Sequence, residues 1–144
     1  MANLDAIRSR VQRMLTDSFD RVEIDRDGDF VIRYESAVTY VSVEEGFGDG
    51  SVVTLRCPLI CDVKITDQLC RWVATEGQEF LLGGCYLNPN ENPTTGWVFF
   101  KYSITADDLD ESELKNAVGA VVVTSNRLDN ELRDRFGGKL FGKE

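Results

Sequence analysis

The sequence predicts an α+β domain built on a mainly antiparallel sheet, and three observations support this prediction. The chain has 144 residues, the length of one domain, and its 42% apolar and 28% charged residues are typical of a globular protein. Three segments carry apolar residues at helical spacing, and the segments between them alternate every second residue. The predicted order is helix, four strands, helix, two strands, helix, with hairpin-length links between most strands.

The first helix is predicted over residues 3–18, where one face carries Leu4, Ile7, Val11 and Met14. Asn3 is the expected N-terminal cap. Three short strands follow at residues 21–25, 30–34 and 38–44, with turns at Asp27-Gly28 and near Glu35-Ser36. A glycine-rich link leads to a fourth strand over residues 52–59, which Pro58 is expected to end, so these strands form a meander.

The second half of the chain follows the same logic. Thr66 is the expected cap of a helix that runs to about residue 76, with an apolar side of Leu69, Cys70, Trp72 and Val73. Residues 80–87 and 96–105 form the next strand pair. The last helix begins at the capping box Asp110 and Glu113, ends at Gly137-Gly138, and has an inner face of Leu114, Val118, Val121, Ser125, Leu128 and Leu132. We expect one domain over residues 1–138 and a short tail, residues 139–144, that either hangs free or folds back through Leu140 and Phe141.

Composition argues against several classes of function. The net charge of −9 repels phosphate backbones and anionic lipid headgroups, so neither nucleic acid nor a membrane is an expected partner. The chain contains no histidine, which removes the commonest general acid/base and the commonest metal ligand. With no signal peptide or membrane span in the pattern, we expect a cytoplasmic protein whose four cysteines are free thiols.

Four local patterns suggest chemistry, but a structural explanation is preferred for each. The carboxylates of Asp25, Asp27 and Asp29 are spaced like the start of a calcium loop, yet the sixth and twelfth positions are Phe30 and Ser36, so an acidic hairpin turn is expected. The cysteines lack zinc-knuckle spacing and are expected in the core. The acidic residues 107–113 suit a helix start, and the glycines of residues 46–50 do not form a phosphate cradle. We therefore predict no enzyme activity, no metal and no cofactor.

The strands offer a different signal, because several carry apolar residues on both faces. In the last strand Val98, Phe100, Tyr102 and Ile104 form one face, and the opposite face begins with Trp97 and Phe99. Tyr34 and Tyr40 are candidates for the same second surface. If the three helices cover one side, the other side receives a ligand or a second subunit. The alternative is that loops or the last helix bury these rings within the monomer.

Several runs resemble a known family. They are DRDGDFVIRYESAVTYVSVE, RCPLICDVKIT, FFKYSITADDLDESELKNAV and RFGG, and they resemble the actinobacterial YbjN-like proteins of the type III secretion chaperone-like superfamily. The similarity spans roughly residues 4–138, and its most specific pieces are Asp27-Gly28-Asp29, residues 106–109 and Phe136-Gly137-Gly138. It implies a type III secretion chaperone-like fold, homodimers, and binding of peptide segments of client proteins. In the second helix, this chain has Leu69-Cys70-Arg71-Trp72-Val73 where many relatives have a Leu-Asn pattern. Such helices contribute to dimer contacts in secretion chaperones. The resemblance therefore implies that Leu69, Trp72 and Val73 contact a second subunit.

The leading hypothesis is therefore a non-enzymatic, chaperone-like protein that captures client segments on an apolar sheet surface formed by Tyr34, Tyr40, Trp97 and Phe99, with strand edges open to β-augmentation. The alternative is a regulatory or scaffold subunit that binds one folded partner. A chaperone retains several apolar peptides weakly, whereas a scaffold ignores them and co-purifies with a single protein.

Overall fold

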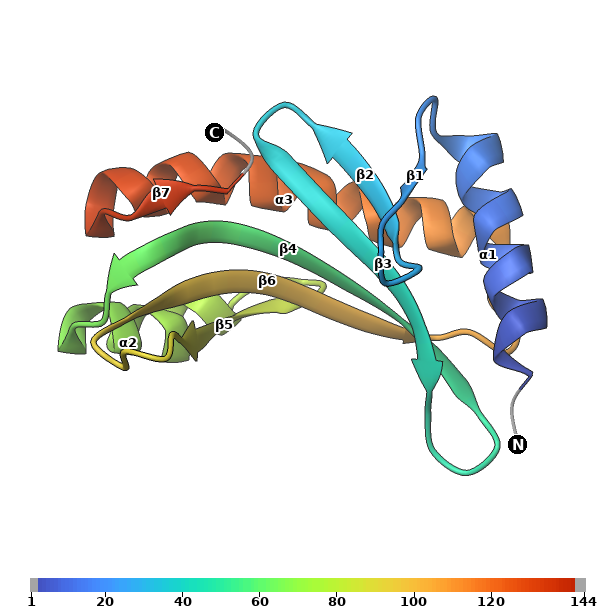
Figure 1. The fold of residues 1–144 in the computed structure, drawn as a ribbon, viewed down its shortest axis with the longest axis horizontal. Coiled ribbons are helices and arrows are strands. Elements are labelled where there is room, and N and C mark those ends of the chain that lie inside the picture. Colours follow the sequence, from blue (N-terminus) through green and yellow to red (C-terminus); the bar gives the residue numbers. More distant parts are fainter. Residues whose placement is uncertain (1–2, 142–144) are drawn as a thin grey trace.

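Seven strands form one sheet in the computed structural model, which describes residues 3–141 (Figure 1). The strands are Glu23–Ile24 (β1), Phe30–Tyr34 (β2), Ala37–Glu45 (β3), Ser51–Lys64 (β4), Gly84–Pro89 (β5), Thr95–Thr105 (β6) and Lys139–Leu140 (β7). Their order is β1-β2-β3-β4-β6-β5, and β7 pairs with β4 off this path. Every pair is antiparallel, which confirms the α+β class and the meander of the first four strands.

The helices begin where the sequence predicts caps. The bounds are Leu4–Ser18 (α1), Asp67–Ala74 (α2) and Glu111–Phe136 (α3), with a 3-10 turn at Glu76–Gln78 (η1). Asn3 and Thr66 accept hydrogen bonds from first-turn amides of α1 and α2, and Asp110 and Glu113 form a capping box on α3. In the part of the chain that the structure describes, no helix is long and apolar enough to span a membrane.

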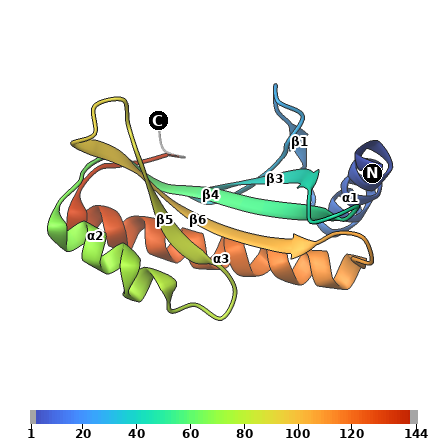
Figure 2. The same cartoon turned by 90° about the horizontal axis from the view of Figure 1, so that it is seen from below.

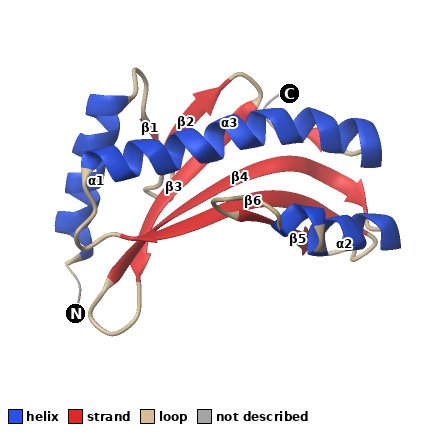
Figure 3. Ribbon diagram, turned by 180° about the vertical axis from the view of Figure 1, so that it is seen from behind, coloured by secondary structure: helices blue, strands red, loops and turns tan. Residues whose placement is uncertain are grey.

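All three helices lie against the sheet or its end. Figure 3 shows α3 along the length of the sheet, with α1 at one end and α2 at the other. Figure 2 shows that α2 and α3 share one side, whereas β1 and the end of the described chain lie on the opposite side. We call these two sides of the sheet the covered face and the open face.

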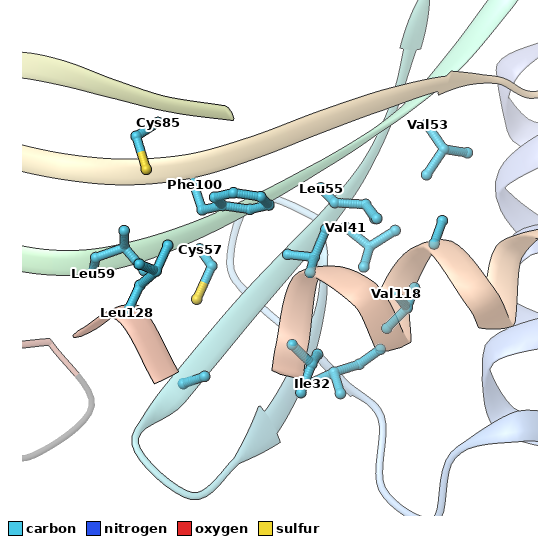
Figure 4. Close-up of a cluster of buried hydrophobic side chains, with 14 of the residues drawn as sticks. Ile32, Val41, Val53, Leu55, Cys57, Leu59, Cys85, Phe100, Val118 and Leu128 are labelled. Carbon is cyan, nitrogen blue, oxygen red and sulfur yellow. The ribbon is translucent and has the colours of Figure 1, made fainter. Parts of the chain in front are cut away.

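The core fills the space between α3 and the covered face. All six α3 positions predicted to face inward are buried, with side chains at most 3% exposed. They meet residues from the strands, among them Ile32, Val41, Leu55 and Phe100 (Figure 4). Cys57 and Cys85 also lie in this layer, as expected for cysteines that behave as small apolar side chains.

A buried polar cluster attaches the β2–β3 turn to α3. The Ser36 hydroxyl donates to Asp129 Oδ2 at 2.6 Å and lies 2.9 Å from Asn126 Oδ1, which also accepts from the Ser36 amide. The Asn126 amide nitrogen donates to Glu35. Glu35 has a φ of 52° in this tight turn. The turn is thus held by polar contacts at a point where the covered face meets the helix.

A second polar contact attaches α1 to the far end of the sheet. Arg10 donates from Nη2 to the carbonyl oxygen of Ala106 and, at 3.2 Å, to that of Asp107. Asp107 in turn accepts from the backbone amide of Ser51 at 3.1 Å. These contacts join α1, the start of β4 and the loop that leads into α3.

The strand β4 is longer than predicted, and its extension matters for the site. The sequence placed its end at Leu59 because of Pro58, but the strand continues to Lys64 through two register shifts, one between Pro58 and Ile60 and one between Ile60 and Val63. A proline at such an irregularity removes no regular ladder bond. β3 pairs only with the first part of β4, residues 51–56, so the rest of that side is left to β7.

Three smaller expectations need correction. β5 begins at Gly84, and Phe80 lies before it, packed edge-on against Phe100 with ring centroids 5.2 Å apart. Cys70, predicted on the apolar side of α2, is exposed. Of the two fates given for the tail, the described part folds back, since Lys139–Leu140 is a strand; residues 1–2 and 142–144 lie outside the described range.

Candidate functional site: the open face of the sheet

Alternation along β6 separates the two faces of the sheet. Val98 and Phe100 are completely buried against the helices, as the sequence predicted. Trp97 and Phe99 point to the other side and are half-buried, and Lys101 after them is exposed. Because side chains in a strand alternate strictly, this register fixes which rings are available on the open face.

Five aromatic rings form a continuous line on the open face, which we call the aromatic row: Tyr86, Phe99, Trp97, Phe141 and Tyr40. The Tyr86 and Phe99 rings stack with centroids 5.1 Å apart, and Phe99 stacks on Trp97 at 5.8 Å. Phe141 follows at 5.5 Å from Trp97 and 6.2 Å from Tyr40, in tilted and edge-on arrangements. The row therefore crosses from β5 over β6 to β3.

The strand pairing explains why these rings meet. Tyr86 lies directly opposite Phe99 in the antiparallel ladder of β5 and β6, and such cross-strand aromatic pairs stabilise sheets. Trp97 is two residues before Phe99 and so shares its face. Tyr40 comes from β3, on the far side of β4, and Phe141 fills the interval between it and Trp97. Offset and edge-on contacts of this kind are the preferred aromatic geometries.

The polar border of the row is made by a few charged side chains. Arg56 of β4 forms an ion pair with Glu44 at 3.2 Å, and Ser42 donates to the same carboxylate at 2.9 Å. The Lys101 ammonium lies 5.9 Å from the centre of the Tyr86 ring. Burial raises the pKa of both Tyr40 and Tyr86 above that of an exposed phenol, so both hydroxyls stay protonated at neutral pH. The row thus presents apolar ring surface with neutral hydroxyls.

Tyr34 does not join the other three predicted residues. In β2, Phe30, Ile32 and Tyr34 share one face, and the first two are buried in the core. Tyr40 pairs with Val31 and therefore points to the opposite side. Tyr34 is 46% exposed, but at the end of the covered face. The expectation that Tyr34 shares a surface with Tyr40 is corrected, whereas Tyr40, Trp97 and Phe99 do lie together.

Sequence reasoning missed two members of the row. Tyr86 lay within a predicted strand whose partner register was unknown, and only the pairing with Phe99 shows its role. Phe141 was noted as a residue through which the tail could fold back, without a destination. An aromatic residue three positions after a helix-ending Gly-Gly is the signal that could have pointed to it.

The three predicted dimer contacts on α2 differ in how far they are exposed. Leu69 is completely buried and Trp72 is 5% exposed; both belong to the core of this protomer. Trp72 packs edge-on against Phe136, with ring centroids 6.2 Å apart. Val73 is half-buried and keeps some free surface. Of these three residues, only Val73 offers appreciable surface to a second subunit.

The patterns that suggested chemistry have structural roles. The Asp25 carboxylate accepts from the backbone amides of Asp27 and Asp29, both at 2.9 Å, which closes the hairpin turn around Gly28. Burial, followed by repulsion from Asp25 and Asp27, raises the pKa of Asp29. Among residues 3–141, no group of three or more histidine, cysteine, aspartate or glutamate side chains could hold a metal ion.

The fold resembles that of a solved structure. A search of solved structures finds the Yersinia pestis type III secretion chaperone SycH, in a crystal structure with a stable fragment of YscM2. The match has a TM-score of 0.53 and 11% sequence identity, and covers 85% of this chain and 98% of that one. At this identity the likeness shows the fold, which is that of a type III secretion chaperone.

The family follows from the sequence itself. The chain belongs to the family described as T3SS (YopN, CesT) and YbjN peptide-binding chaperone 1, whose model matches residues 5–144. This confirms the YbjN and secretion-chaperone resemblance at the level of the family. No curated protein matches the chain.

Proposed function

We propose that this protein binds extended segments of client proteins on the aromatic row and that it acts without covalent chemistry, metal or cofactor. The binding surface consists of Tyr40, Trp97 and Phe99, predicted from the sequence, together with Tyr86 and the position now held by Phe141. Membership of a peptide-binding chaperone family supports this proposal.

One observation supports it most strongly: the two faces of the same strands differ in what covers them. On the covered face Val98 and Phe100 have no exposed surface and belong to the core cluster. On the open face the neighbouring rings Trp97 and Phe99 stack on one another but keep exposed surface. Exposed apolar surface arranged in one continuous line is typical of interaction sites. Each large side chain that a client covers completely contributes about 1.5–3 kcal/mol.

The direct test is the double variant Trp97→Ala with Phe99→Ala, assayed on an array of apolar peptides. We expect the retained peptides to be lost, because two adjacent rings of the row are removed. The midpoint of thermal unfolding should fall much less than on removal of a core ring such as Phe100, since Trp97 and Phe99 are not part of the core. A large loss of stability would instead mean that the row is structural.

The chain provides a matched control. Phe47 and Leu81 are also large apolar residues, and both are almost completely exposed, but they lie outside the row. Phe47→Ala with Leu81→Ala should leave peptide retention unchanged. If this control lost binding equally, binding would reflect general stickiness and the row would not be the site. If the unmodified protein retained no peptide and co-purified with one folded protein, it would be a scaffold.

The proposal also includes a homodimer and a cytoplasmic location, as the family resemblance and the sequence suggest. The surface that α2 offers is centred on Val73, next to the exposed Cys70. Light scattering of the protein and of Val73→Asp tests the dimer: a dimer that this substitution converts to monomer supports contact through α2. Cell fractionation tests the location.

A further inference from the structure

The last described residues of the chain occupy a place in the sheet that suits a strand from another polypeptide. Lys139 and Leu140 pair with Cys61 and Ile60 of β4, on the side that β3 has left. Phe141 continues into the aromatic row, between Trp97 and Tyr40. The chain therefore places its own short peptide both on a strand edge and on the proposed binding surface.

Two successive side chains of this peptide serve the two faces of the sheet. Leu140 lies opposite Ile60, is 5% exposed and belongs to the core cluster. Phe141, one residue later, meets rings on the open face. An extended peptide with an apolar residue followed by an aromatic one reproduces this alternation, whereas other orders send the ring to the wrong side.

The backbone pairing that holds this peptide to the sheet is short. β7 has only two residues, and short strands with few paired residues open at low free-energy cost. It is joined to α3 by Gly137 and Gly138, whose φ angles of 87° and 82° lie in the left-handed region. A side chain on Gly138 would approach the Cys61 carbonyl oxygen to 3.0 Å. This pair of glycines can serve as a hinge between α3 and the peptide.

Release would leave a site with two kinds of recognition. Beyond its β3-paired part, β4 would keep only β6 as a neighbour, so backbone groups near Ile60 and Cys61 would lack ladder partners. Next to that edge, the Phe141 ring would leave the space between Tyr40 and Trp97. Main-chain bonds give such a site affinity, and the alternate side-chain positions give it specificity.

We propose that Lys139–Phe141 is an internal stand-in for the client: a client segment with an apolar residue followed by an aromatic residue replaces it as an antiparallel strand on β4. This inference rests on the proposed function and adds to it the edge, the direction and the side-chain order of the client. The tail also competes with the client. Because a tethered peptide acts at an effective concentration of order mM, it excludes weakly matching sequences.

The test locks the tail in place. Lys139 is directly opposite Cys61, and antiparallel partners have Cα atoms about 4.5–5.5 Å apart, within the range that a disulfide spans. Lys139→Cys, in a Cys70→Ser background that removes the exposed thiol, should form this cross-link on oxidation, as mass spectrometry would verify. The probe is a fluorescein-labelled peptide of residues 137–144, GGKLFGKE, and the control peptide carries serine in place of its leucine and phenylalanine.

We expect the oxidised protein to bind no probe in an anisotropy titration and the reduced protein to regain binding. A separate variant, Phe141→Ser, weakens the internal competitor and should bind the probe about tenfold or more tightly than the unmodified protein. The control peptide should bind none of these forms. The Phe141→Ser comparison stands even if no cross-link forms.

The outcomes separate this inference from the proposed function. If oxidation leaves probe binding unchanged, if Phe141→Ser fails to strengthen it, or if no form binds the probe, the stand-in is overturned. The proposed function then still holds if the peptide array shows retention that depends on Trp97 and Phe99. The proposed function fails if the protein retains no peptide of the array, or if the double substitution leaves peptide retention unchanged.

Discussion

The two faces of one sheet differ although the same strands build both. On β6, Phe100 is buried completely under α3 while Phe99, its neighbour in sequence, is half-buried in the aromatic row. If the open face binds clients as proposed, stability and binding are carried by alternate residues of one strand. Substitutions in neighbouring positions should therefore have separable effects, and the following predictions test that separation.

The largest contrast is expected in thiol reactivity. Cys70 is exposed, whereas Cys57 and Cys85 are buried on the covered face. Burial raises the pKa of Cys57, and raises that of Cys85 to about 12, so neither forms the reactive thiolate at neutral pH. With Ellman's reagent, Cys70 should react at once and the other two at least about a thousandfold more slowly, through unfolding. Cys61, whose thiol donates to the carbonyl oxygen of Lys139 in the short strand β7, should have an intermediate rate.

All four thiols should react at similar rates in denaturant, which controls for intrinsic differences in thiol reactivity. Fast native-state labelling of Cys57 or Cys85 would show that the covered face opens easily. That result would remove the distinction between the faces.

The next contrast compares Phe100→Ala with Phe99→Ala. Removing Phe100 leaves a cavity under α3 and should lower the free energy of unfolding by about 3–5 kcal/mol. Removing Phe99 loses stacking in a half-exposed row and should cost about 1–2 kcal/mol. Urea denaturation of both variants measures the difference. Equal losses would contradict the assignment of the open face to binding.

A smaller contrast compares two serine hydroxyls. Ser36 is buried and donates to Asp129, so Ser36→Ala deprives a buried carboxyl group of a partner and should cost about 1–3 kcal/mol. Ser42 is also buried, but it donates to the Glu44 carboxylate, which is 41% exposed and keeps Arg56 as a partner, so Ser42→Ala should cost below about 1 kcal/mol. Thermal or urea unfolding distinguishes the two. A reversed order would mean that the polar cluster at α3 is not stabilising.

The smallest effect should appear in the pH dependence of the β1–β2 turn. The pKa of Asp29 is raised above its usual 3.8, first by burial and then by Asp25 and Asp27. The Asp29 carboxyl group therefore binds its proton more tightly in the folded state than in the unfolded state. The stability that this tighter binding contributes is lost as the pH rises above 3.8 through the raised pKa. Asp29→Asn does not undergo this loss. Its free energy of unfolding, relative to that of the unmodified protein, should therefore be higher at neutral pH than at acidic pH.

Urea midpoints for the two proteins at acidic and neutral pH measure this gain. Arg56, whose charge lowers the Asp29 pKa, and Glu44, whose charge raises it, are present in both proteins and serve as a constant background. A stability difference that does not change with pH would contradict the prediction.

Much of the fold could be predicted because local signals coincide with it. The capping box at Asp110 and Glu113 fixed the start of α3, and the helical spacing identified all six of its inward residues. Alternation in β6 separated Trp97 and Phe99 from Val98 and Phe100. Such periodicities are properties of one segment and need no knowledge of its partners.

What depended on pairing between segments was harder to predict. Tyr34 was placed on the wrong face because both faces of β2 and β3 carry some apolar residues, so composition did not reveal the register. β4 was cut short at Pro58 because the register shift that accommodates a proline is a feature of the β4–β6 pair. The position of Phe141 depended on a strand pairing between Leu140 and Ile60, which no local pattern encodes.

The contact of Arg10 with the loop before α3 has a consequence for biosynthesis. Arg10 and Ala106 are 96 residues apart, and α1 also packs its apolar side, Val11, Met14 and Leu15, into the core. At about 5–20 residues per second, the ribosome makes this stripe some 5–20 s before the segment that covers it. During that interval the apolar side of the nascent helix lacks its α3 contacts and stays partly exposed.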